Sequence, residues 1–302
     1  MTEPKKILLQ TTIPPTEDDW SIARFSSLAA LLRSVRDENG NALYEVTARD
    51  RDPPGTPDSV LSTIDQSDFD ELWLFAVDVG DGLTEEDCAA ISRFRRNGGG
   101  LLVTRDHMDL GSSVCTLGGV GKAHYFHSKQ PDPDANRRRR DDPYTTYIDW
   151  PNFHSGANGD FFKIEFVGEA HPVLANQRSP TGLIRFLPSH PHEGDIGAPK
   201  GEDARVILTG KSKATGNDFN VSVAFEPGEH GGAAIAESTF HRFADYNWDP
   251  QFGCPSFVTE KPGDGLKRVP EAMADTHRYA LNIAAWLSEA SRTQQQTRHD
   301  AR

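Results

Sequence analysis

The stretch Asn97-Gly-Gly-Gly-Leu-Leu-Val-Thr-Arg-Asp-His-Met-Asp109 decides the fold. Glycines precede a short apolar run, and ionisable side chains follow that run directly. The pattern predicts a buried central strand that delivers Arg105, Asp106, His107 and Asp109 to one edge of a sheet. In open α/β sheets, ligands bind beyond the carboxyl ends of the strands. We therefore expect the functional site at this edge.

The segments before this stretch alternate between apolar runs and helical patterns. Residues 5–10, 43–47 and 72–77 are predicted to be strands. The runs 7–9 and 72–77 are continuously apolar, as buried strands are. Apolar residues recur at helical spacing between Asp18 or Asp19 and Val35. Thr84-Glu-Glu-Asp87 has the form of a capping box at the start of a second helix. This order predicts a mainly parallel sheet covered on both faces by helices.

Regular patterning stops after the predicted central strand and resumes some fifty residues later. Strands are then expected at 161–167, 183–187, 205–209, 219–225 and 233–237, and a last helix begins at Pro270. Alternation within 161–167 is typical of a half-exposed antiparallel strand. We expect one domain over residues 1–290, with an insertion at about 110–160, and a polar tail over 291–302.

Composition restricts the classes of partner. The 302 residues carry a net charge of -13, which argues against non-specific binding to nucleic acid or to an anionic membrane. The basic run 137–140 is flanked by acids, so a solvated loop is expected there rather than a phosphate site. The three cysteines are widely spaced and form no paired motif. These features, and the lack of a signal or membrane-spanning pattern, favour a cytoplasmic protein, for which a homo-oligomer is compatible with the sequence.

Three segments together resemble a known family. They are Val77-Asp-Val-Gly-Asp-Gly-Leu-Thr-Glu-Glu, Gly98-Gly-Gly-Leu-Leu-Val, and the small-residue run before Phe240-His241 with the last helix behind it. This combination is similar to the ThuA-like (trehalose-utilisation) family of the class I glutamine amidotransferase-like superfamily. The resemblance implies a flavodoxin-like or Rossmann-like three-layer sandwich. It covers about half of the chain and leaves roughly 110–230 without a counterpart.

The same resemblance argues against the superfamily's glutaminase chemistry. Its amidotransferases place a cysteine nucleophile on a sharp turn after the equivalent strand, whereas this chain has Thr104-Arg-Asp-His-Met108 there. Cys115 comes about ten residues too late. His241 corresponds to the family's histidine, and ThuA-like members also present a histidine at the turn.

His107 and His241 are the expected catalytic pair. A histidine has a pKa near neutrality, so one imidazole could take a proton while Asp106 or Asp245 orients it. If the backbone stays extended, Asp106 and His107 point to opposite faces, and a turn at the strand end would remove this objection. The alternative is that His107 only forms hydrogen bonds at the start of the next helix.

Residues expected to bind substrate lie at the ends of the predicted strands. Thr11, Asp78, Arg105 and Asp109 follow strands directly. Tyr246 and Trp248 lie in the polar and aromatic segment 241–249, where their rings could stack on a sugar. The alternative for that segment is a surface loop anchored by its aromatics.

Other motifs support weaker interpretations. His124 and His127 could join His107 or Asp109 in a zinc or iron site, but this spacing alone is weak support. No metal and no cofactor are therefore assigned. His154 lies among turn-forming residues that could cover a pocket, and the glycines at 118–121 lack the setting of a phosphate-binding loop.

These observations predict an enzyme that acts on a small polar or carbohydrate-like molecule by His/Asp acid-base chemistry. It would be hydrolase-like or isomerase-like and not a glutaminase. The alternative is a non-catalytic ligand-binding or protein-interaction module whose insertion recognises a partner.

Overall fold

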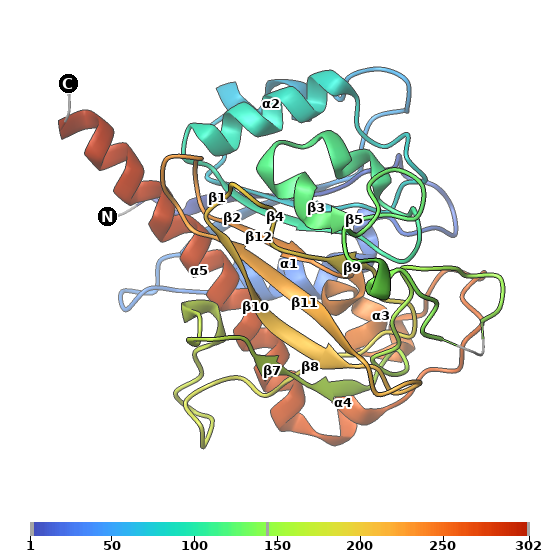
Figure 1. Ribbon diagram of the computed structural model, residues 1–302. Helices are drawn as coiled ribbons and strands as arrows, with labels where there is room; N and C mark the ends of the chain where they lie inside the picture. The colour runs from blue at the N-terminus through green and yellow to red at the C-terminus, as the bar shows by residue number, and fades with distance from the viewer. Residues whose placement is uncertain (1–2, 143–144, 301–302) are drawn as a thin grey trace.

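An eight-stranded sheet forms the centre of the protein, whose computed structural model describes residues 3–142 and 145–300. Part of the expected insertion (143–144) and the end of the expected tail (301–302) lie outside the described residues. The sheet contains β1 (Lys5–Thr11), β2 (Tyr44–Arg49), β3 (Glu71–Phe75), β4 (Gly100–Thr104), β7 (Glu165–Phe166), β10 (Ala204–Lys211), β11 (Asp218–Phe225) and β12 (Ala234–Glu237). Their order is β2-β1-β3-β4-β12-β11-β10-β7 (Figure 1).

The first five strands in this order are parallel, and the last three extend the sheet in antiparallel fashion. The mainly parallel α/β sheet predicted from the sequence is therefore confirmed. Residues 161–167, expected to form one strand, are divided between two sheets. β6 (Phe161–Lys163) pairs with β8 (Phe186–Pro188), whereas β7 joins the edge of the large sheet beside β10.

Helices cover both faces of the sheet. Successive side chains of a strand point to opposite sides, so each strand contributes apolar side chains to the packing on both faces. On one face, Leu8, Leu72 and Leu74 form a buried cluster with Ile91 and Phe94 of α2 (Glu85–Arg96). On the other face, side chains from β1 and β3 pack against α1 (Ser26–Ser34) and α5 (Pro270–Asp300). Figure 1 shows α2 on the side of the sheet opposite to α1 and α5.

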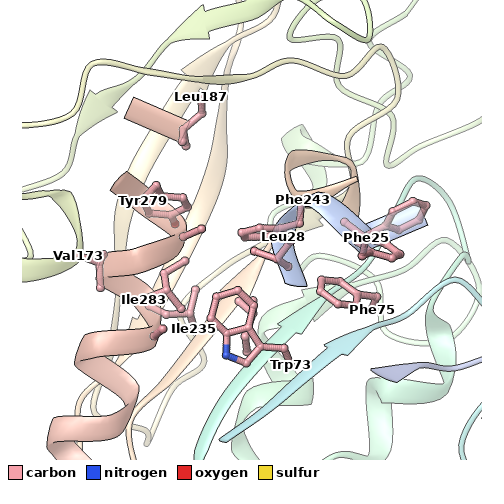
Figure 2. Close-up of a cluster of buried hydrophobic side chains, with 14 of the residues drawn as sticks. Phe25, Leu28, Trp73, Phe75, Val173, Leu187, Ile235, Phe243, Tyr279 and Ile283 are labelled. Atoms are coloured by element: carbon pink, nitrogen blue, oxygen red, sulfur yellow. The ribbon is translucent and has the colours of Figure 1, made fainter. Parts of the chain in front are cut away.

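The second of these clusters is rich in large rings. Figure 2 shows Trp73 and Phe75 of β3 beside Phe25, Leu28 and Phe243. The rings of Phe25 and Phe75 stack with their centroids 4.0 Å apart. Complete burial of side chains of this size stabilises a fold by roughly 1.5–3 kcal/mol each. This packing fixes β3 and α1 relative to each other, and thereby one wall of the site described below.

Helix starts follow local capping chemistry. The capping box predicted at Thr84 is present, since the side chains of Thr84 and Asp87 each accept a hydrogen bond from the other's backbone N–H. The predicted start of the first helix, at residue 18 or 19, is wrong. A short 3-10 turn, η1 (Ile22–Phe25), comes first and α1 begins only at Ser26. Asp18 has a backbone φ of +61°, whereas a residue that caps a helix takes an extended backbone, so no helix begins after it.

The expected insertion consists of short elements. It contains the 3-10 turns η3 (Ser112–Thr116), η4 (Gly119–Ala123) and η5 (Ala135–Arg137), together with the two-residue strand β5 (His124–Tyr125). β5 pairs with β9 (Asp195–Ile196), so the insertion is tied to a segment far along the chain.

The remaining elements are short, and all but one lie in the second half of the chain. They are the 3-10 turns η2 (Leu61–Gln66), η6 (Pro172–Leu174), η7 (Phe240–Phe243) and η8 (Pro250–Phe252), and the short helices α3 (Asp245–Trp248) and α4 (Gly265–Arg268). α5 continues through most of the segment expected to be a tail. Within the described ranges, no helix combines the length and apolar character needed to cross a membrane.

Candidate functional site

A cavity of about 450 Å³ lies at the carboxyl ends of the parallel strands, where the sequence predicts the site. This volume is within the range of small-molecule sites. Its polar floor comes from four loops: the turn after β4, the loop before β6, the loop after β8, and η7 after β12. The side chains that form this floor are Asp106, His107, Asn158, His190, His192 and His241.

Asp106 is the centre of the floor. Its carboxylate lies 3.4 Å from Nδ1 of His107, 3.3 Å from Nε2 of His190 and 3.5 Å from Nε2 of His241. The contacts with His107 and His241 share one oxygen, Oδ2, while His190 faces Oδ1. The two histidines singled out from the sequence therefore meet at a single carboxylate.

A tight turn after β4 makes this arrangement possible. The N–H of Leu110 donates to the carbonyl of His107, and the N–H of Asp106 donates back to the carbonyl of Leu110. Met108 takes a positive φ of 45° and donates its N–H to the carbonyl of Pro151. Because the chain turns here, the adjacent side chains of Asp106 and His107 both face the cavity.

His190 and His241 stack on each other, with ring centroids 3.5 Å apart and planes 14° apart. Each ring holds its Nδ1 against an asparagine oxygen: His190 against Asn158 at 2.8 Å, and His241 against Asn247 at 3.4 Å. Trp20 packs edge-on against the His241 ring at 4.7 Å. The two imidazoles are thus held in position from behind, with Nε2 of each directed at Asp106.

Charge states follow from burial and from these contacts. Burial by itself would raise the pKa of Asp106, but His107 and His190 hold it well below its usual range. Burial, and then the neighbouring His241, lower the pKa of His190 well below its usual value. At neutral pH Asp106 is therefore ionised, and burial disfavours the charged form of His190.

His192 forms a second histidine-carboxylate pair at the side of the cavity. Its Nε2 lies 3.0 Å from Oε1 of Glu260, and its Nδ1 lies 3.1 Å from Oδ1 of Asn152. The ring contacts those of His107 at 5.5 Å and His190 at 5.7 Å, edge to face. The His192–Glu260 pair therefore extends the polar floor towards the mouth.

The mouth of the cavity is apolar. Val79, Tyr147 and Phe257 line it, and their exposed fractions are 75%, 77% and 58%. Exposed large apolar groups gathered at one opening are characteristic of a ligand site. Asp19 and Glu260 add carboxylates, and among the described residues that line the cavity there is neither lysine nor arginine.

A buried ionic network supports η7 from below. Arg242 forms ion pairs with Glu193 and with Glu237, and all three side chains are at most 1% exposed. The hydroxyl of Tyr279 donates to Glu237, and that of Ser155 donates to Glu193. Arg242 neighbours His241 in the sequence, so this network fixes the backbone that carries His241.

Two of the expected binding residues serve other contacts. The hydroxyl of Thr11 donates to Oδ1 of Asp50. Asp78 accepts hydrogen bonds from the hydroxyls of Thr12 and Ser113, at 2.6 and 2.8 Å. Both side chains join the ends of strands to the loops around them and lie outside the cavity lining.

Arg105 and Asp109 also lie outside the lining. The Arg105 guanidinium is buried, stacks over Phe126 at 4.1 Å, and donates to the backbone carbonyl of Asp195 at 3.1 Å. Asp109 accepts from the N–H and the hydroxyl of Ser128. Arg105 thereby connects the turn after β4 to the β5–β9 ribbon, and both residues stabilise the loop.

The segment after His241 turns its expected site residues away. Asp245 accepts from the N–H groups of Ser26 and Ser27 and so caps α1. The indole N–H of Trp248 donates to the carbonyl of Arg242 at 2.8 Å, and Tyr246 is 4% exposed. The orienting role expected of Asp106 or Asp245 is thus geometrically open to Asp106 alone.

The alternative metal group of the sequence is not assembled. His124 is buried beside Phe126, and burial, with Arg105 second, lowers its pKa to about 3. Nδ1 of His127 lies 3.1 Å from the carbonyl of Trp150. His154 lies outside the cavity lining, so a lid role for its ring has no support from its position.

Sequence reasoning missed half of the polar floor. His190 and His192 lie in Ser189-His-Pro-His-Glu193, directly after β8. Histidines two residues apart in extended backbone face the same side, so a histidine pair at a strand end was an available signal. Asn158 precedes Gly159, a pair that is typical of a tight turn, and no local pattern marks Glu260.

Comparisons with known proteins do not assign the chain to a family. No protein-family profile and no curated protein matches the chain. A solved structure described as "mmIFT52 N-terminal domain" aligns with 79% of this chain and 88% of its own, at 11% identity and a TM-score of 0.46. The exo-beta-1,4-mannosidase Op5Man5 from Opitutaceae bacterium strain TAV5 aligns at 12% identity and a TM-score of 0.35. That match spans 94% of this chain but only 36% of the mannosidase.

The fold and the cavity together define a class of protein. The chain is an α/β protein with a large, mostly parallel sheet, and its candidate site lies at the carboxyl edge of that sheet. The floor of the site combines the carboxylate of Asp106 with the imidazoles of His107, His190, His192 and His241.

Proposed function

We propose that the protein is an enzyme that acts on a small polar or carbohydrate-like molecule by His/Asp acid-base chemistry. One observation carries the proposal: a single ionised carboxylate, Asp106, contacts three imidazoles on the floor of a small-molecule cavity. Burial, opposed charges and convergent titratable groups are the arrangement by which active sites tune proton transfer.

His107 is the proposed general base. Its side chain is 20% exposed, compared with 5% for His190 and 3% for His241, so substrate reaches it most readily. Nδ1 faces Asp106, which leaves Nε2 on the opposite side of the ring to accept a proton. Asp106 then stabilises the imidazolium that forms, as a carboxylate behind a catalytic histidine does.

The lining of the cavity suggests the kind of substrate. Carboxylates of Asp19, Asp106 and Glu260, without a lysine or arginine among the described lining residues, disfavour phosphorylated or other anionic molecules. A polar floor beneath an apolar mouth suits a molecule with hydroxyls on one side and C–H groups on the other. A neutral sugar ring has this character, and Tyr147 and Phe257 offer aromatic faces for it to stack on.

The ThuA-like resemblance is part of the same proposal. The order β2-β1-β3-β4 is that of the first strands of flavodoxin-like sheets, which supports a flavodoxin-like, amidotransferase-like fold. His241 follows β12 as the family's histidine follows its closing strand, and no cysteine occupies the turn after β4. A cytoplasmic location and homo-oligomer formation stay predictions.

The test is a panel of neutral mono- and disaccharides that includes trehalose. Binding is measured by saturation-transfer NMR, and turnover by one-dimensional proton NMR over hours. We expect at least one sugar to bind and to be converted by the wild-type protein. His107→Gln should then lower kcat by about 10²–10⁴-fold, the usual contribution of a general base, with a much smaller effect on binding.

His127→Gln is the matched control, because this ring lies outside the cavity and should leave both measurements unchanged. Binding without turnover by the wild-type protein would favour the alternative, a non-catalytic ligand-binding module. A panel that neither binds nor reacts would count against a carbohydrate-like substrate. A kcat of His107→Gln equal to that of the wild type would contradict the assignment of the base.

A further inference from the structure

The floor of the cavity contains a group of ligand-type atoms that acid-base chemistry does not fully use. One atom each from Asp106, His190 and His241 lies within 4.8 Å of the other two. In the described part of the chain, this is the group of histidine, cysteine and acidic side chains that converges in this way. All three residues are buried.

Hydrogen bonds behind the rings determine which nitrogen of each imidazole carries the proton. The backbone carbonyl of Ser189 can only accept, so the group of Asn247 that faces it at 2.8 Å is the NH₂. The oxygen of Asn247 therefore faces Nδ1 of His241, and that nitrogen must carry the hydrogen.

The same asparagine fixes the second ring. The NH₂ of Asn247 also donates to Oδ1 of Asn158 at 3.2 Å, which shows that this atom of Asn158 is an acceptor. His190 approaches the same oxygen at 2.8 Å and must likewise carry its hydrogen on Nδ1. In their neutral forms, both imidazoles consequently present the lone pair of Nε2 to Asp106.

Two lone pairs that face a carboxylate repel it unless a positive charge lies between them. The separations are 3.3 and 3.5 Å, close enough for this repulsion to matter in a buried site. Nε2 of His190 and Oδ1 of Asp106 are both buried, and neither has a hydrogen-bond partner of acceptable geometry.

We propose that Asp106, His190 and His241 bind one divalent transition-metal ion, through a carboxylate oxygen and the two Nε2 atoms. Two ligands of a tetrahedral zinc ion, each about 2.1 Å from the metal, are roughly 3.4 Å apart. Both contacts are close to this spacing, although they reach different oxygens of Asp106: Nε2 of His190 lies 3.3 Å from Oδ1, and Nε2 of His241 lies 3.5 Å from Oδ2. Because the rings are nearly parallel, binding requires one of them to rotate so that both lone pairs converge.

The chemistry of the ligands selects the type of ion. Imidazole suits zinc, iron, copper and nickel, whereas magnesium and calcium prefer oxygen ligands alone. Asn158 and Asn247 supply the outer hydrogen bonds to Nδ1 that fix the tautomer of metal-bound histidines. Three protein ligands leave at least one coordination position open, and the cavity adjoins it.

The inference concerns the same cavity as the proposed function, but it does not depend on any reaction there. Zn²⁺ binding is measured by isothermal titration calorimetry on protein stripped with EDTA and carrying no affinity tag. The wild-type protein should bind one Zn²⁺ per chain. His190→Gln and His241→Gln should each weaken binding at least about a hundredfold, and Asn158→Ala by 10–100-fold, as the loss of an outer partner does.

His127→Gln again serves as the control and should bind like the wild type. Circular dichroism and the urea midpoint of each variant show whether it is folded. A wild-type protein that binds no Zn²⁺, or folded His190→Gln and His241→Gln variants with unchanged affinity, would overturn the proposal.

A Co²⁺-substituted wild-type protein provides a test that needs no variant. Both rings bind through Nε2 and keep hydrogen on Nδ1, so the proton spectrum should contain two strongly shifted, exchangeable imidazole N–H signals. If these signals are missing, the proposed ligand set is incorrect. Metal binding without any sugar turnover would contradict the proposed function alone, and turnover by metal-free protein would leave the acid-base mechanism intact.

Discussion

Replacement of Arg242 by methionine should destabilise the protein more than any loss of a surface charge. Arg242 is the cation that neutralises two carboxylates, Glu193 and Glu237, neither of which is exposed to solvent. Methionine fills similar space but leaves both acids buried without a counter-ion. Loss of one partner of a buried ion pair typically costs 3–5 kcal/mol. With two acids affected, we expect a loss of about 3–5 kcal/mol at pH 8.

The loss of stability in this variant should increase with pH. Burial raises the pKa of both Glu193 and Glu237 above the ordinary value, and Arg242 opposes that shift. Without Arg242 both pKa values rise further, whereas the unfolded chain keeps values near 4.3. The folded variant then binds more protons than the unfolded one, so its free energy of unfolding falls as pH rises above about 4.3. The destabilisation must therefore be smaller at pH 5 than at pH 8.

Urea unfolding followed by circular dichroism at pH 5 and pH 8 measures both quantities. Arg268→Met is the matched control, since its ion pair with Asp264 is exposed on both sides, 70% and 65%, and should not affect stability measurably. A loss below about 1 kcal/mol at pH 8, far under the range for broken buried pairs, would refute the reasoning. So would a loss of equal size at the two pH values.

Three further substitutions separate structural residues from the site. Asp58→Asn should lower the free energy of unfolding at pH 7 by about 2 kcal/mol, because hydrogen bonds outweigh burial and hold the pKa of Asp58 at about 2. The wild type should lose this advantage between about pH 4 and pH 2, which urea midpoints over that range would show. Asp245→Ala removes the cap of α1 and should cost about 1–2 kcal/mol by the same assay, with sugar and Zn²⁺ affinities unchanged. Gly194→Ala places a methyl against the side chain of Arg105 and 2.6 Å from the carbonyl oxygen of Asp106. It should lower the free energy of unfolding by about 1–3 kcal/mol and also weaken Zn²⁺ binding.

Each of these substitutions has an outcome that would contradict it. A urea midpoint of the wild type that does not approach that of Asp58→Asn in acid would show that the carboxylate is not the source of the stability. Weakened ligand binding in Asp245→Ala would return this residue to the site. Unaltered Zn²⁺ affinity in Gly194→Ala would mean that the floor tolerates displacement of Asp106.

The parallel half of the fold was predictable because its signals are local. Continuous apolar runs and a capping box each reflect interactions within a few residues, and β1, β3, β4 and α2 appear where these patterns place them. The start of α1 was not predictable in this way. Its cap is Asp245, which is more than two hundred residues away in the sequence.

The residues of the site likewise divide into those that a local sequence pattern identifies and those that it does not. Asp106 and His107 lie in the turn just after β4, and His241 follows a strand of small residues, so position along the chain identifies them. His190 follows β8 in a His-Pro-His motif that marks a strand end, but the motif does not place it beside Asp106, which tertiary packing does. The predicted site role of Asp245 was wrong for the opposite reason. It lies four residues after His241, yet the intervening 3-10 turn directs its side chain to α1.

A crystal structure of the protein with a bound sugar from the panel tests the central claim most directly. The claim is that the floor around Asp106 is the working site. The ligand should lie in the cavity, with one of its hydroxyls within hydrogen-bond distance of Nε2 of His107 and its ring against Tyr147 or Phe257. A sugar bound elsewhere on the surface, with the floor around Asp106 untouched, would contradict the account.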